Sequence, residues 1–170
     1  MKSILFLAGM LLCMSVSAFN NEREGFVLGL GIGIANIDYD SGSFSASDTG
    51  IATSLKIGYG FTNDFSLYYL RNATFSEEEG YSFAEGITGI GVSKYLNPHG
   101  ASLYFLGSLG IGDLINLDES ETETGSAYLL GLGYEFHNHS SVEFTILKTK
   151  IDDVDYNSTA LQLTYNYTFY

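Results

Sequence analysis

Apolar and polar positions alternate along most of this chain. The pattern is clearest near its end, where every odd position from Leu161 to Phe169 is apolar or aromatic and the residues between them are small or polar. Side chains alternate across a β-strand, so one face of this segment is apolar and the other polar. Similar segments recur along the chain, with aromatic rings near their ends. The pattern predicts strands whose apolar faces point outward to lipid.

Eight segments carry this pattern and are separated by two kinds of connection. The tight turns lie at 62–64, 97–100 and 137–139, and they alternate with longer, mostly acidic connections at 40–48, 76–80, 116–125 and 152–157. Each segment is long enough for a tilted membrane span of about ten residues. We therefore predict an all-β, eight-stranded antiparallel up-and-down transmembrane β-barrel, with strands at 25–39, 49–61, 65–75, 81–96, 101–115, 126–136, 140–151 and 158–170.

The alternation also predicts which face of each strand meets lipid. Outward positions expected near the middle of the bilayer are Leu30, Ile57, Leu132 and Ile146. The third and fourth strands do not show a clear phase. A β-bulge or two could resolve them, but the sequence does not say which.

The first 18 residues have the three parts of a signal peptide. Lys2 is the positive residue, an apolar run follows, and Val16-Ser17-Ala18 resembles a cleavage site. Cys13 follows Leu12, where a lipoprotein signal requires a small residue. We predict a signal peptide at 1–18 and a single barrel domain at 19–170, which leaves the mature chain without cysteine and without thiol chemistry.

The charge is strongly acidic, with 7 Lys and Arg against 20 Asp and Glu and a formal net charge of −13. Phosphate binding needs clustered Lys and Arg, so nucleic acid is excluded as a partner. Export places the N-terminus in the periplasm, and an even number of strands returns the C-terminus to the same side. The tight turns are then expected in the periplasm and the acidic connections outside the cell.

The leader, eight strands, three tight turns, four polar connections and aromatic last strand together resemble the small OmpA/OmpX-type outer-membrane barrels of Gram-negative bacteria. The resemblance covers essentially the whole mature chain, with one departure: the outward register ends at Phe169, and Tyr170 is one residue extra. It implies outer-membrane lipid, lipopolysaccharide and the barrel-insertion machinery as partners, an unknown external ligand, and no cofactor.

Three charges are expected inside the barrel: Lys56, Glu135 and Glu143. Side chains fill the interior of an eight-stranded barrel, and buried charges there should be paired. We interpret them as a polar network that plugs the lumen, completed by Tyr104, Gln162, Thr164 and Asn166. A narrow or gated pore is the alternative.

Three other cations fall at the outer ends of strands: Arg71, Lys148 and Lys150. At that height they either contact lipopolysaccharide phosphates, with their stems in apolar surroundings, or offset the neighbouring acidic connections. Arg71 lies on a strand of unclear phase and is not assigned to the same site as the lysines.

Several motifs resemble catalytic or metal sites but lack the required context. The Gly29–Gly31–Gly33 repeat lies inside a strand with no helix following, unlike a dinucleotide loop. His137 and His139 have no further metal ligands nearby.

His139, Ser141 and Glu143 hold the residue types of a hydrolytic triad. In the lipid A deacylases, however, the His-x-Ser pair lies at the outer end of the penultimate strand, where this chain has Lys148-Thr149-Lys150.

Asp153, Asp155 and Asn157 resemble the opening of a calcium loop, but Ser158 and Thr164 replace its glycine and glutamate. We therefore expect neither an enzyme nor a dedicated metal site. Loose divalent-ion binding by the acidic loops is the alternative to loops that are only solvated. We expect a surface-exposed membrane barrel that contributes to envelope integrity or, through its acidic loops, to surface interaction. The alternatives are the pore, a lipid-modifying enzyme and a soluble lipocalin-like carrier.

Overall fold

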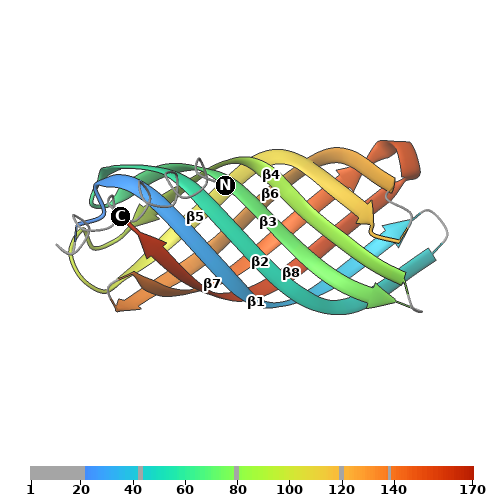
Figure 1. The fold of residues 1–170 in the computed structure, drawn as a ribbon, viewed down its shortest axis with the longest axis horizontal. Coiled ribbons are helices and arrows are strands. Elements are labelled where there is room, and N and C mark those ends of the chain that lie inside the picture. Colours follow the sequence, from blue (N-terminus) through green and yellow to red (C-terminus); the bar gives the residue numbers. More distant parts are fainter. Residues whose placement is uncertain (1–21, 42–43, 79–80, 119–120, 138) are drawn as a thin grey trace, which may run out of the picture.

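The computed structural model describes residues 22–41, 44–78, 81–118, 121–137 and 139–170. Eight antiparallel strands form one closed barrel, in which each strand pairs with the next and β8 pairs with β1 (Figure 1). This confirms the predicted fold class. The elements are β1 (Gly25–Ser41), β2 (Phe44–Thr62), β3 (Phe65–Glu78), β4 (Tyr81–Tyr95), β5 (Ser102–Asn116), β6 (Glu121–His137), β7 (Ser140–Ile151), the 3-10 helix η2 (Asp152–Val154) and β8 (Tyr156–Phe169). The predicted signal peptide lies outside the described residues.

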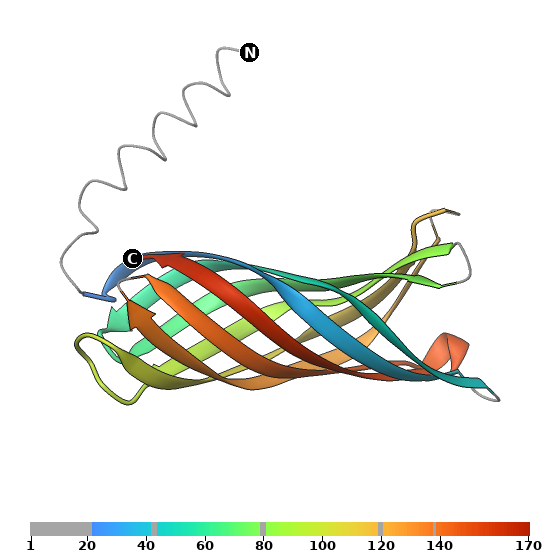
Figure 2. The ribbon, with the colours of Figure 1, turned by 90° about the horizontal axis from the view of Figure 1, so that it is seen from below.

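The two ends of the barrel differ in their connections. The C-terminus lies at the end that holds the short β2–β3, β4–β5 and β6–β7 connections, which we call the turn end (Figure 1). The opposite end, which we call the acidic end, carries the other four connections, and hairpins project there past the barrel body (Figure 2). Within the described residues, no helix is long and apolar enough to span a bilayer.

The strands at the acidic end are longer than predicted, and this corrects the expected loops. The segment 40–48 was expected to be a connection, yet β1 runs to Ser41 and β2 begins at Phe44, with Asp40 paired opposite Ser45. Likewise β6 begins at Glu121, inside the expected connection 116–125. Backbone hydrogen bonds hold an antiparallel ladder together whatever its side chains are, so pairing continues where the apolar alternation ends.

The outer wall of the barrel is an apolar belt with aromatic residues at both margins. On β6 the outward positions are Tyr128, Leu130, Leu132, Tyr134 and Phe136, each 42–58% exposed. Leu30 and Ile57 are likewise exposed, and Ile146 is 39% exposed, so the predicted phase of these strands is confirmed. A soluble carrier would turn such side chains inward. The belt has the outward apolar band and aromatic girdles of a membrane barrel.

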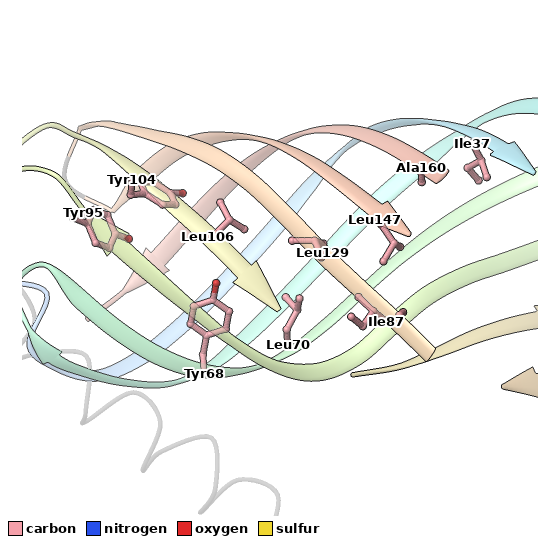
Figure 3. Close-up of a cluster of buried hydrophobic side chains, with 11 residues drawn as sticks. Ile37, Tyr68, Leu70, Ile87, Tyr95, Tyr104, Leu106, Leu129, Leu147 and Ala160 are labelled. Atoms are coloured by element: carbon pink, nitrogen blue, oxygen red, sulfur yellow. The ribbon is translucent and has the colours of Figure 1, made fainter. Parts of the chain in front are cut away.

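The phase of β3 and β4 was unclear because their lumen faces are also apolar. Tyr68, Leu70 and Ile87 point into the lumen and are almost completely buried. They belong to a cluster that extends along the bore from Tyr95 and Tyr104 to Ile37 and Ala160 (Figure 3). The β3–β4 register has no shift, so a bulge within this pair is not the reason for the unclear phase. Register shifts occur instead at Gly60/Thr62 and Glu135/His137, beside the turn end.

Glycines on the lumen face make room for the large rings in this cluster. A Cβ atom at Gly133 would overlap the ring of Tyr104, and one at Gly91 would overlap the hydroxyl of Ser108 and the ring of Tyr68. Gly107 differs because it faces outward, where a Cβ would meet a methyl group of Leu130 at 3.2 Å. The bore is therefore closely packed, and its inward glycines are part of that packing.

Replacing Gly133 with alanine should lower the free energy of unfolding by about 1–3 kcal/mol, because the added methyl group displaces the Tyr104 ring in a filled bore. Gly107→Ala is the matched control, since the flexible Leu130 side chain can move toward lipid. Urea unfolding in lipid vesicles measures both variants. Equal stability of the two variants would contradict the packed arrangement around Tyr104.

Candidate functional site

The lumen holds an ion pair that joins two strands across the bore. Lys56 on β2 donates from Nζ to Oε1 of Glu143 on β7, and the two side chains are only 7% and 4% exposed. The Tyr104 hydroxyl lies 2.5 Å from the same carboxylate oxygen and 3.0 Å from Oγ of Ser141. The Lys56 ammonium also lies 5.4 Å from the ring centroid of Tyr68. Both charges are thus desolvated, paired and hydrogen-bonded, which a buried ion pair requires.

Glu135 belongs to a separate cluster at the turn end, so the three predicted lumen charges do not form one network. Its partner is Arg23, whose Nη2 lies 3.0 Å and whose Nε lies 3.2 Å from the carboxylate oxygens. Arg23 also donates to the backbone oxygen of Asn97 at 3.0 Å and lies over the ring of Tyr95 at 4.2 Å. Sequence reasoning missed Arg23 because it precedes the alternating pattern of the first strand.

Tyr170, the residue that departs from the family pattern, completes this cluster. Its hydroxyl donates to Oε2 of Glu135 at 3.1 Å and lies 2.6 Å from the hydroxyl of Tyr95. Burial raises the pKa of the Tyr170 hydroxyl well above its usual range, and the neighbouring Tyr95 and Glu135 act in the same direction. Tyr170 therefore remains a neutral hydrogen-bond donor and helps to close the turn end.

Between the charged clusters and the acidic end lies a set of buried amides and hydroxyls. Asn72 and Gln162 exchange two hydrogen bonds, of 3.0 and 2.9 Å, across the bore. Thr74 and Thr145 each contact the Gln162 amide at 3.1 Å. Asn166 bonds to Ser54 at 2.8 Å and to Thr164 at 2.9 Å, in a further group. The predicted polar residues therefore fill the lumen as several local groups.

Two of the three outer cations are paired with carboxylates. Arg71 contacts both carboxylate oxygens of Asp113, one of them at 2.8 Å, on the outer wall. Lys150 lies 2.6 Å from Asp152. Lys148 is exposed and forms no ion pair within the part of the chain that the structure describes. The interpretation of these cations as offsets of neighbouring acids thus fits Arg71 and Lys150 better than it fits Lys148.

A groove on the outer wall brings the two lysines together near the acidic end. Lys148 and Lys150 line this groove of about 300 Å³ with Tyr128, Asn157 and Thr159. Arg71 lies elsewhere, on β3, and is not part of it.

The residue types of a hydrolytic triad do not assemble at the turn end. Nδ1 of His139 lies 2.8 Å from the backbone oxygen of Thr168, while the Ser141 hydroxyl is engaged by Tyr104. Glu143 is paired with Lys56. A nucleophile must be in reach of its base. Here the His139 ring contacts the backbone of Thr168, whereas Ser141 and Glu143 both contact the Tyr104 hydroxyl. Among the described residues, no group of three or more His, Cys, Asp or Glu is arranged to hold a metal ion.

An outward cation at the turn end is also paired. Lys94 on β4 points outward and donates to Asp64 in the β2–β3 turn. Hydrogen bonds from Lys94 and Thr62 hold the pKa of the Asp64 carboxyl below its usual range. Lys94 therefore offers an outward lysine at the opposite height of the barrel from Lys148.

The chain was compared with known proteins and solved structures. A search of curated proteins gave no significant match. Among solved structures the chain is similar to Ail, the attachment invasion locus protein of Yersinia pestis, with 22% identity over 85% of this chain and 99% of that chain and a TM-score of 0.60. It is also similar to Neisserial surface protein A, with 14% identity over 82% of this chain and 96% of that chain and a TM-score of 0.56. OprG from Pseudomonas aeruginosa matches with 12% identity over 88% of this chain and 99% of that chain, at a TM-score of 0.51.

At these identities the solved structures agree in fold alone. The family model described as the outer membrane protein beta-barrel domain matches residues 4–169, which is most of the sequence. The closed eight-stranded topology and the apolar outer belt agree with that match. The chain therefore belongs to the outer membrane protein β-barrel family, and its place is the outer membrane.

Proposed function

We propose that this protein is a non-enzymatic barrel whose acidic end faces the outside of the cell, where it contributes to envelope integrity and surface contact. The observation that carries the proposal is the separation of its charges. Cations in the bore are paired one to one with buried acids, as in Arg23–Glu135 and Lys56–Glu143, whereas exposed acids gather at the acidic end. Both termini then lie in the periplasm.

The acidic end favours partners that are neutral or cationic. Exposed carboxylates there include those of Asp40, Glu77, Asp118, Asp152, Asp153 and Asp155. The similar Ail protein was solved with the heparin analogue sucrose octasulfate, which is a polyanion. An acidic surface repels polyanions and accelerates the approach of oppositely charged partners. We therefore propose that the acidic end contacts a neutral or cationic partner and not a polyanion such as the one in that complex.

Deletion of the gene and complementation provide the test. Wild-type protein should restore both the envelope barrier and adhesion to surfaces. A variant with Glu77→Gln, Asp118→Asn and Asp153→Asn should restore the barrier but not adhesion, because the barrel remains and its acidic surface is weakened. Matching adhesion by the two complemented strains would contradict a role for the acidic end. An intact barrier in the deletion strain would contradict a role in envelope integrity.

The packed bore supports a closed barrel over the pore alternative. In planar bilayers the purified protein should produce no resolved conductance steps, because ion pairs, amides and rings fill the lumen. The single variant Tyr104→Ala, which removes a central ring, provides the comparison for a loosened plug. Reproducible steps from the wild-type protein would favour the gated pore.

The groove beside Lys148 supports lipopolysaccharide as a contact. Replacing Lys148 and Lys150 together with glutamine should weaken the retention of lipopolysaccharide by the purified barrel, since lysine binds phosphate as a point charge. Folding in simple phospholipid should not change. Lys94→Gln is the matched control, because Lys94 faces outward at the turn end, away from the outer leaflet in this orientation. Undiminished retention in the double variant would assign the lysines to the acidic loops.

A further inference from the structure

The lumen opens at the acidic end into a cavity of about 260 Å³. Its lining is mostly aromatic and aliphatic, with two carboxylates in the wall: Tyr39, Phe83, Leu114 and Tyr156 together with Asp48 and Glu85. None of these residues takes part in the plug clusters formed by Lys56 and Arg23. The cavity is thus a separate feature of the bore, and it lies at the end that we propose to face outward.

Glu85 is the exception among the buried acids of this barrel. It is 3% exposed, yet its carboxylate contacts are two hydroxyl donors, Tyr156 at 2.8 Å and Ser158. The buried Glu135 and Glu143 are each paired with a cationic side chain, whereas within the described residues no cationic side chain forms an ion pair with Glu85. A desolvated carboxylate is costly without a counter-charge. Its position in a cavity wall leaves space for that charge to come from a ligand.

Asp48 offers a second oxygen in the same cavity. This residue lies on the lumen face of β2, opposite Ile37 of β1. Its Oδ1 accepts the backbone N–H of Thr49 at 2.7 Å, whereas its Oδ2 is enclosed and has no hydrogen-bond partner in the described structure. Buried polar atoms are normally hydrogen-bonded, so an enclosed carboxylate oxygen without a donor indicates a missing partner.

The aromatic residues determine which kind of cation fits. The rings of Tyr39 and Tyr156 are stacked, with centroids 6.0 Å apart and an interplanar angle of 27°, and Phe83 also lines the cavity. Aromatic faces attract cations, and sites that combine several rings with a carboxylate recognise alkylated ammonium groups. A hydrated inorganic ion would gain little from this apolar lining, because it prefers oxygen ligands.

We propose that this cavity binds a small organic cation, an ammonium group that carries apolar substituents. The ammonium lies against Glu85 and Asp48, and its substituents contact Tyr39, Phe83 and Tyr156. The net charge of −13 raises the local concentration of cations around the protein and so assists entry. This inference goes beyond the proposed function, since it holds whether or not the acidic end contacts another surface.

The test uses choline as the probe and 3,3-dimethyl-1-butanol, its uncharged isostere, as the ligand control. The full barrel is refolded in a maltoside detergent, because phosphocholine headgroups would occupy the same site. Ligand-observed NMR titration should show saturable binding of choline and at least a tenfold weaker response to the alcohol. Glu85→Gln should weaken choline binding about tenfold, which corresponds to about 1.4 kcal/mol.

Glu77→Gln is the matched protein control, because it removes the same charge from an exposed position on β3 at the same end. It should change choline binding by less than about twofold, as expected for a screened surface charge. Folding of each variant is checked by its heat-dependent shift in gel mobility. If Glu85→Gln does not fold, Asp48→Asn takes its place with the same expected direction.

Three results would overturn the proposal. The first is the absence of saturable choline binding to the wild-type barrel. The second is equal binding of choline and its uncharged isostere, which would make the cavity merely apolar. The third is equal weakening by the Glu77 and cavity variants, which would assign binding to the general acidic field. Adhesion and barrier phenotypes are measured separately, so failure here is distinguishable from failure of the proposed function.

Discussion

Replacing Lys56 with methionine should lower the free energy of unfolding by about 3–5 kcal/mol, because it leaves a buried carboxylate without its cation. The structure identifies that carboxylate as Glu143, which is 3% exposed and has Tyr104 as its remaining strong donor. Methionine keeps most of the side-chain volume, so the loss is chiefly electrostatic. Urea unfolding of the barrel in lipid vesicles measures the effect.

A double-mutant cycle separates this ion pair from the other lumen cluster. Lys56→Met combined with Glu143→Gln should recover part of the loss, giving a coupling energy of about 1–3 kcal/mol. Lys56→Met combined with Glu135→Gln should be additive, because Glu135 pairs with Arg23. If Lys56 couples to Glu135 and not to Glu143, the arrangement across the bore is wrong.

Replacing Leu132 with arginine should lower the free energy of unfolding of the barrel in lipid by about 2–4 kcal/mol, because it places a charge near the middle of the hydrocarbon. Leu132 is 45% exposed and lies on the outward row of β6 between Tyr128 and Phe136, which mark the margins of the apolar belt. Leu30, Ile57 and Ile146 lie on outward faces of other strands and should behave in the same way.

Thr122→Arg is the matched control, since Thr122 lies on the same strand and the same outward row as Leu132 but beyond Tyr128, near the acidic end. Arginine there meets water or headgroups and should change stability by no more than about 1 kcal/mol. Equilibrium folding into phospholipid vesicles compares the two. Equal tolerance at both positions would mean that the apolar belt does not face lipid.

The fold and most strand phases are readable from the sequence for a local reason. Side chains alternate with a period of two, and in a membrane barrel that period separates lipid from lumen. Val142, Phe144 and Ile146 alternate with Glu143 and Thr145, so β7 could be oriented from its own residues. In β3 and β4 the signal failed, because Tyr68, Leu70 and Ile87 make the lumen face apolar as well.

The alternation also predicted strands that are shorter at the acidic end than those in the structure. Polar residues such as Asp40 and Ser45 pair there through their backbones, and a backbone ladder leaves no mark in the apolar pattern. The same limit hid Arg23. It lies before β1 and outside any alternation, so nothing nearby indicated that it reaches Glu135 on β6.

Outside β3 and β4, the sequence by itself determined which residues face inward, and therefore that Lys56, Glu135 and Glu143 share the lumen. Only the tertiary structure decided which of these charged side chains form ion pairs with each other. Lys56 on β2 and Glu143 on β7 are separated in the wall by β1 and β8, and they meet because the closed barrel sets their stagger. Stagger depends on the register of every strand pair together, and no local period carries that information.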